Sequence, residues 1–205
     1  MRALVQGCPG ATVVGMELWF EGLRFAQKRT SALLVQADVR QCPLTKTFHL
    51  VGLFDVLEHL PDENEALLAI RQLLALDGKL ILTVPAHQAL WSYFDEAAMH
   101  CRRYSPRQVC DRLKEAGFEV EFVSQFMAFI FPLVWLVRRI APAGQRRRDP
   151  QSAREMAAAE FRIVPLVNGV LNWVLGIEAR WVGRGHRLPI GTSLVVVARI
   201  RQGSS

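Results

Sequence analysis

The chain has 205 residues, 51% of them hydrophobic, and carries a formal net charge of +6. This length is enough for one domain with a sizeable core. The charge is uneven, because residues 1–120 hold 13 Lys/Arg and 14 Asp/Glu whereas residues 121–205 hold 12 Arg and 5 Asp/Glu. Arginines beside apolar residues indicate an anionic membrane surface or an amphipathic substrate. No nucleic-acid-binding motif accompanies them, which argues against DNA or RNA as a partner.

The first 38 residues alternate between helix and strand. Residues 1–7 resemble the end of a helix, closed by Pro9 and Gly10. Residues 11–16 form a short apolar run that predicts a strand, with Glu17 at its end. A helical pattern covers residues 22–29, and residues 32–37 predict the next strand, which ends at Asp38.

The stretch 48–61 (FHLVGLFDVLEHLP) is the centre of the sequence. Its near-continuous apolar run predicts a strand at residues 49–54 that is buried on both faces of a sheet. Asp55, Glu58 and His59 follow it, at the edge where open α/β sheets place their ligands. An amphipathic helix at residues 63–75 and a strand at 79–84 come next. The alternation predicts a parallel α/β sheet with right-handed crossovers.

The second half is less regular. Residues 86–104 are too polar and aromatic for a plain connector. Residues 105–116 predict a helix capped by Ser105 with Pro106 in its first turn, and residues 118–123 predict a strand. The uncharged run 126–137 is too short to cross a bilayer. A basic linker at 138–150, a mostly helical stretch at 151–181 and a strong strand at 193–200 complete the chain.

These elements predict three regions. Residues 1–125 are expected to form a cofactor-binding core, and residues 188–205 to hold its closing strand and tail. Residues 126–187 are expected to form an apolar and basic helical insertion, which serves either as a lid or as a membrane-facing segment. A peripheral membrane contact is expected through residues 126–181, whereas an ordinary lid explains the same composition.

Acidic residues close three successive predicted strands, namely Glu17, Asp38 and Asp55. In a doubly wound sheet these strand ends line one edge, where a nucleoside-bearing cofactor can lie. A carboxylate can accept two hydrogen bonds from a ribose diol, which suits Glu17, or one from an adenine amine, which suits Asp38. A single acidic strand end is usually only solvated, but three in register favour a cofactor site.

The chain resembles the class I S-adenosylmethionine-dependent methyltransferases. The segments VVGMELWFEGLRFA, LLVQADVRQCPL, FHLVGLFDVLEHLPDENEALLAIRQLLALDGKLILTVPA and AGFEVEFVSQF match successive blocks of that family over residues 1 to about 125, and SLVVVARI resembles its closing antiparallel strand. The resemblance implies a Rossmann-like, doubly wound α/β fold with a mostly parallel sheet and a final antiparallel strand.

The same resemblance implies S-adenosylmethionine as the cofactor. It also implies that Glu17, Asp38, Val39, Phe54, Asp55 and Val56 bind it: Glu17 at the ribose, Asp38 at the adenine, and residues 54–56 beside the methionine moiety. Methyl transfer is a direct displacement, so the protein chiefly aligns the acceptor, the methyl group and the sulfur. The acceptor is expected to be a small molecule, amphipathic or lipid-like.

One departure from the family pattern is marked. The family's first strand and its glycine-rich loop have no counterpart before residues 1–7, which match the first helix. The missing strand would be the central one, between the strands that end at Glu17 and Asp55. Two strand edges are therefore expected to lack partners. Either an N-terminal truncation or a degenerate relative explains this, and truncation is favoured because the remaining site residues are those of a working enzyme.

Three residues are candidates for catalysis on the acceptor side. His59 could take a proton from the acceptor, or it could cap the following turn and orient Glu58. His87 and Tyr93 follow the strand predicted at residues 79–84, which matches the family's fifth strand, after which the family varies its acceptor pocket; packing within a lid is the alternative.

Neither the histidines nor the cysteines suggest a metal. The five histidines and four cysteines form no HxH, HExxH or CxxC pattern, so the sequence predicts no metal site and reduced thiols. Gln6, Gly7 and Pro9 interrupt any signal peptide, so a cytoplasmic location is expected, with peripheral membrane contact as a variant.

Two other kinds of function compete with an active methyltransferase. One is a catalytically inactive remnant that keeps the fold but cannot hold cofactor, and the other is a peripheral membrane-binding module. A dinucleotide-dependent oxidoreductase is the nearest rival enzyme, but three carboxylate-ended strands and the VLEHLP block disfavour it.

Overall fold

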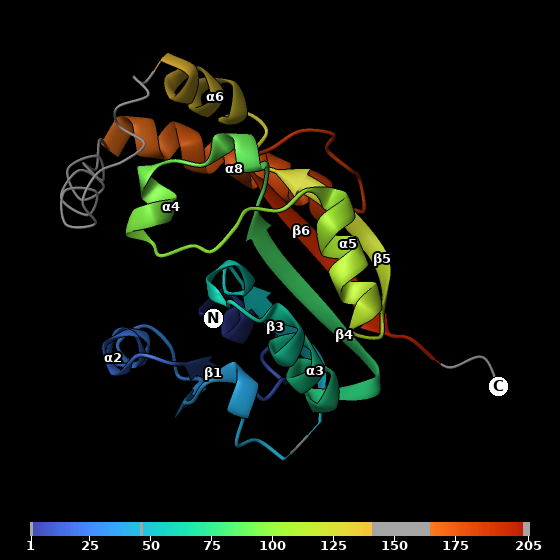
Figure 1. Ribbon diagram of the computed structural model, residues 1–205. Coiled ribbons are helices and arrows are strands. Elements are labelled where there is room, and N and C mark those ends of the chain that lie inside the picture. The colour runs from blue at the N-terminus through green and yellow to red at the C-terminus, as the bar shows by residue number, and fades with distance from the viewer. Residues whose placement is uncertain (1, 46, 141–164, 203–205) are drawn as a thin grey trace.

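A computed structural model of the protein describes residues 2–45, 47–140 and 165–202, and it holds two β-sheets (Figure 1). The smaller sheet pairs β1 (Val14–Glu17) with β2 (Leu33–Gln36) in parallel. The larger has the order β3-β4-β6-β5, with β3 (Phe48–Phe54), β4 (Leu74–Pro85), β6 (Ser193–Ile200) and β5 (Phe118–Phe126). β3 and β4 are parallel, and β6 runs antiparallel to both of its neighbours. The predicted α/β class with a closing antiparallel strand is confirmed.

The helices alternate with the strands as expected. They are α1 (Arg2–Gly7), α2 (Phe20–Gln27), α3 (Glu63–Leu73), α4 (Tyr93–Ala97), α5 (Pro106–Glu115), α6 (Phe131–Ile140) and α8 (Pro165–Gly183), with short 3-10 turns η1 (Val39–Gln41), η2 (Leu57–His59) and η3 (Gln88–Leu90). Residues 151–164 of the predicted C-terminal helical stretch lie outside the described residues. Within the described ranges, no helix is both long and apolar enough to cross a membrane.

Local sequence explains where α5 begins and ends. The Ser105 hydroxyl accepts from the Gln108 amide at 3.2 Å, the Gln108 side chain accepts from the Ser105 amide at 2.8 Å, and Pro106 takes the first turn. Gly117 follows the helix with φ 83°, a left-handed conformation that glycine adopts without strain. The predicted N-terminal cap at Ser105 is therefore present.

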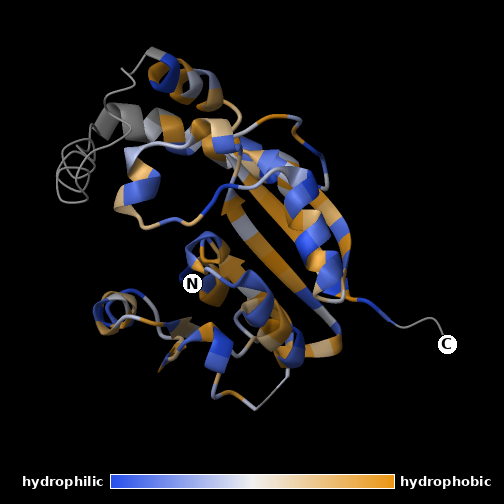
Figure 2. Ribbon diagram, viewed as in Figure 1, coloured by the Kyte–Doolittle hydropathy of each residue, from blue (hydrophilic) through white to orange (hydrophobic). Residues whose placement is uncertain are grey.

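The main core lies between the larger sheet and the helices α3 and α5, which cover one of its faces (Figure 1). Apolar residues of β4 and β6 line this core, and Figure 2 shows both strands as mainly hydrophobic. The completely buried side chains include Leu67, Leu80, Leu82, Leu113 and Phe118. Burying each such side chain contributes on the order of 2 kcal/mol to stability, so packing on this face stabilises the larger sheet.

The predicted gap in the sheet is present. β1 and β3 belong to different sheets, and each pairs with a described strand along one edge only. Asp55 donates its amide to the Thr83 carbonyl at 3.0 Å, which shows that odd-numbered amides of β3 face β4. The even-numbered amides of this strand therefore face the gap. The carboxyl ends of β1, β2 and β3 nevertheless approach a shared region, which is where the site lies.

The C-terminal helices are tied to the end of β5. The buried Glu178 carboxylate of α8 accepts from the Ala128 amide at 3.0 Å, just before α6. The Ser124 hydroxyl accepts from the Leu188 amide at 2.9 Å, and the Gln125 side chain donates to the Pro189 carbonyl at 2.7 Å. These contacts hold α6 and α8 beyond the strand ends, next to α4 (Figure 1).

The unpaired edge of β3 predicts an alternating pattern of amide exchange. Leu50, Gly52 and Phe54 should exchange with solvent deuterium much faster than Val51, Leu53 and Asp55, because only the latter donate to β4. Residue-resolved exchange measured by NMR tests this. Equal protection at all six positions would mean that another strand covers the edge in solution.

Candidate functional site

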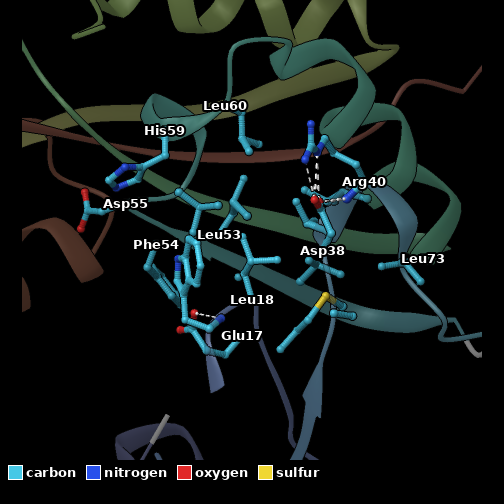
Figure 3. Close-up of a pocket in the computed structure, with 18 of the residues that line it drawn as sticks. Glu17, Leu18, Asp38, Arg40, Leu53, Phe54, Asp55, His59, Leu60 and Leu73 are labelled. Carbon is cyan, nitrogen blue, oxygen red and sulfur yellow. Dashed lines mark hydrogen bonds and ion pairs between the residues drawn. The ribbon is translucent and has the colours of Figure 1, made fainter. Parts of the chain in front are cut away.

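One cavity of about 790 Å³ opens between the two sheets, at the carboxyl ends of β1, β2 and β3. Its long side runs along β1 and β3, where Val14, Met16, Leu50 and Val51 make it apolar. Its polar end holds every residue predicted to bind cofactor, together with one predicted acceptor-side residue: Glu17, Asp38, Val39, Phe54, Asp55, Val56 and His59. The structure thus brings together residues that lie up to 42 positions apart in the chain (Figure 3).

Glu17 lies at the end of β1 with its carboxylate folded toward α2. Its Oε1 accepts from the Trp19 amide at 3.0 Å. A Cβ built on Gly22 would lie 2.8 Å from the Glu17 Cδ, so any larger residue at position 22 would require this carboxylate to move. Among the described residues no donor reaches Oε2, which leaves that oxygen to accept from a bound hydroxyl.

Asp38 lies at the end of β2 and is held by Arg40. Its carboxylate accepts from the Arg40 amide at 2.9 Å and from Nη2 at 2.6 Å, and Nε contacts both oxygens (Figure 3). The hydrogen bonds with Arg40 lower the pKa of Asp38, so this group is anionic at neutral pH. Its partner Arg40 is exposed, so the guanidinium can move aside for a ligand.

The end of β3 supplies Phe54 and Asp55. The Phe54 ring is half exposed and folds back over Gly52, where a Cβ would lie 2.6 Å from a ring carbon. Asp55 has φ 51°, an uncommon conformation for a residue with a side chain, and its amide donates to the Thr83 carbonyl and contacts the Thr83 hydroxyl oxygen at 3.1 Å. This conformation leaves the Asp55 carboxylate beside the His59 ring (Figure 3).

η2 places Glu58 inward and His59 outward. The Glu58 side chain is completely buried, and neither of its oxygens has a hydrogen-bond partner among the described residues. Burial raises the pKa of Glu58 to about 8, and the negative charge of Asp55 adds to this rise. Partial burial of the ring and the neighbouring His100 lower the pKa of His59, so its imidazole is neutral at neutral pH.

The other two predicted acceptor-side residues do not line this cavity. His87 has φ 59°, its Nε2 lies 2.6 Å from the Gln125 side-chain oxygen, and its ring meets Phe131 edge-on at 5.6 Å. Tyr93 begins α4, and its ring stacks on Phe94 at 4.6 Å between centroids. Both therefore belong to the segment between β4 and α5, next to α6 and α8, and their catalytic role stays a prediction.

Sequence reasoning missed His100 and Asp95, which lie behind His59. The His59 and His100 rings meet edge-on, 4.7 Å apart between centroids. The His100 Nδ1 lies 3.0 Å from the Asp95 carboxylate, and Arg103 Nε donates to the same carboxylate at 2.7 Å. No spacing rule links positions 59 and 100, and the only signal was the unusual polarity of residues 86–104.

Comparison with known proteins gives a family and a fold. A family model described as a methyltransferase domain matches residues 4–123. No curated protein matches the chain. Three solved structures illustrate the similarity of fold.

A Haemonchus contortus phosphoethanolamine N-methyltransferase 2 in complex with S-adenosyl-L-methionine has a TM-score of 0.57 at 16% identity, over 98% of this chain and 46% of that one. A TehB-like SAM-dependent methyltransferase from Corynebacterium glutamicum has a TM-score of 0.51 at 15% identity, over 94% and 70%. The [4+2]-cyclase SpnF has a TM-score of 0.58 at 14% identity, over 97% and 70%. At these identities the likeness establishes the fold alone.

The buried Glu58 predicts a dependence of stability on pH. The unfolded chain ionises this group near its ordinary pKa of 4.5, whereas the folded chain resists ionisation up to about pH 8. The free energy of unfolding should therefore fall as pH rises between these values, by at most about 1.4 kcal/mol per pH unit. Glu58→Gln should remove this contribution, as measured by urea unfolding at several pH values. A parallel slope in wild type and variant would contradict the prediction; Glu21→Gln, an exposed site, is the control.

Proposed function

Because the chain belongs to the methyltransferase domain family, we propose that it transfers a methyl group from S-adenosylmethionine to an acceptor bound beside His59. One observation carries this proposal: the ends of β1, β2 and β3 bring Glu17, Asp38 and Asp55 to a single cavity. Such an edge is where open α/β sheets bind nucleosides.

The residues at the polar end of the cavity have the chemistry that this cofactor needs. Glu17 has one oxygen available for a ribose hydroxyl, since the Trp19 amide occupies only Oε1. Asp38 can accept from the adenine amine by sharing its carboxylate with Arg40, whose Nε now bridges both oxygens. Val39 lies next to Asp38, and Phe54, Asp55 and Val56 lie where the methionine moiety is expected.

When bound, S-adenosylmethionine supplies a methyl group on a positively charged sulfur. The chain's own task is to align the acceptor with that methyl group and to exclude water. His59 is the predicted acceptor-side residue that lines the cavity, and its neutral imidazole has a free nitrogen lone pair.

Titration with S-adenosylhomocysteine tests the cofactor site directly. Wild type should bind it in calorimetry, and Glu17→Ala should weaken binding by about 10-fold or more, because charge-assisted hydrogen bonds to the ribose are lost. Glu21→Ala is the matched control, since Glu21 is an exposed acid on α2 outside the cavity. Absence of binding by a folded preparation would favour the inactive remnant.

The acceptor is proposed to be amphipathic, because the helices beyond the strand ends expose apolar surface. Leu133 and Trp135 on α6 and Trp173 on α8 are 65%, 43% and 68% exposed. Arg139, in the last turn of α6, is exposed and lies over the Trp135 ring at 4.9 Å from its centroid, whereas Arg138 lies beside the buried Asp95. Aromatic and aliphatic side chains next to an exposed arginine suit a peripheral contact with an anionic membrane, which would bring a lipid-like acceptor to the site.

Vesicle binding tests the membrane contact. Sedimentation with vesicles of phosphatidylglycerol and phosphatidylcholine should retain wild type, and the Trp135→Ala/Trp173→Ala variant should lose about 10-fold or more in affinity because it buries less apolar surface in the interface. Phe25→Ala is the control, since Phe25 is equally exposed but lies on α2. Equal binding by both variants would argue for an ordinary lid.

A further inference from the structure

Hydrogen bonds to backbone carbonyls of residues 58–61 hold the segment 98–102 against η2. The Cys101 amide donates to the Glu58 carbonyl at 2.7 Å, and the Cys101 thiol contacts the His59 carbonyl at 3.6 Å. The Arg102 guanidinium donates to the Pro61 carbonyl at 2.9 Å. His100 is therefore held beside Glu58 and His59, although about 40 residues separate them in the chain.

Glu58, His59 and His100 form a compact cluster of potential ligands. One ligand atom from each lies within 4.8 Å of the other two. The His100 Nε2 lies 4.0 Å from the Glu58 Oε1. Ligand atoms on a tetrahedral zinc ion lie roughly 3.3 Å apart, so a small movement closes the set. His59 is exposed and has room for such a movement.

Glu58 is the part of this cluster that needs a partner. Its side chain is completely buried, both of its oxygens lack a hydrogen-bond partner among the described residues, and Oε1 faces His100. A distance of 4.0 Å is too long for a hydrogen bond to the imidazole. A buried carboxyl group without a hydrogen-bond partner is costly, and a cation between Glu58 and the two imidazoles would satisfy its oxygens.

Asp95 fixes the orientation of His100 as a ligand. Its buried carboxylate lies 3.0 Å from the His100 Nδ1 and is itself held by Arg103 at 2.7 Å and by the Ser92 amide at 2.9 Å. The Nδ1 proton therefore points to Asp95, and the Nε2 lone pair is directed to the Glu58 side. A metal-bound histidine usually donates the proton of its other ring nitrogen to a carboxylate placed in this way.

From this arrangement we infer that Glu58, His59 and His100 bind a divalent transition-metal ion at the rim of the cavity. Two imidazoles and one carboxylate suit zinc, cobalt, manganese or iron, whereas magnesium and calcium prefer oxygen ligands alone. Three protein ligands leave coordination positions for water or for an oxygen of a bound molecule. The inference departs from the absence of a metal site expected from sequence spacing, and it gives His59 a ligand role in place of a base.

Cobalt titration of the full chain tests this inference without any cofactor, so its outcome is independent of methyl transfer. After treatment with EDTA and dialysis, wild type should bind a single Co²⁺ per chain with visible d–d absorption, and Zn²⁺ should displace it. His59→Ala, at an exposed position, should weaken Co²⁺ binding by at least about 10-fold. His100→Ala should do the same.

His49→Ala is the matched control, because His49 is exposed and outside the cluster, and it should leave Co²⁺ affinity unchanged. Folding of each variant is checked by circular dichroism. Three results would overturn the inference: no saturable binding by folded wild type, equal affinity in all three histidine variants, or a thiolate-to-cobalt charge-transfer band. The last would place the ion on a cysteine such as the exposed Cys101.

Discussion

The described part of the structure depends on finding partners for buried carboxyl groups, because a polar or charged group removed from water needs one. Among the described residues, four acidic side chains are buried: Glu58, Glu63, Asp95 and Glu178. Glu63 lies beside the Tyr104 hydroxyl and within 3.0 Å of both Arg102 and Arg112. Asp95 is matched by Arg103 and His100, and Glu178 by the Ala128 amide. Both arginines that pair with Glu63, and two of the partners of Asp95, come from the short stretch 100–112, so these two acids help to hold the chain between β4 and α5 over the strand ends. Glu58 is the member of the set that has no such match in the described chain.

Much of the fold followed from local pattern. The strand 193–200 has the predicted bounds, and the Ser105 cap begins the predicted helix. Part of the site could also be predicted from the sequence, for a geometric reason. Parallel strands end at a common edge, so acids placed directly after apolar runs had to converge there. Glu17, Asp38 and Asp55 lie at one cavity for that reason, although their contact with cofactor stays a prediction.

The acceptor side could not be predicted in the same way. His100 reaches Glu58 through hydrogen bonds of an irregular segment, and no periodicity encodes such contacts. His87 and Asp55 take left-handed backbone conformations that a β-strand pattern does not suggest. The start of β4 at Leu74 was not predicted, because residues 75–78 bulge between two paired stretches of the strand. Asp77 and Gly78 in this bulge are residues typical of turns, so the sequence pattern did not indicate a strand there.

The division of the sheet has a thermodynamic consequence for any molecule that fills the cavity. Glu17 and Asp38 belong to one sheet, and Asp55 and His59 follow a strand of the other; no described strand pairs with both sheets. A ligand that contacts both groups would link the two sheets, as a shared strand does in a continuous sheet. Its binding free energy would then add to the free energy of unfolding of the whole domain. The domain would become more rigid as the fraction of protein with bound ligand increases.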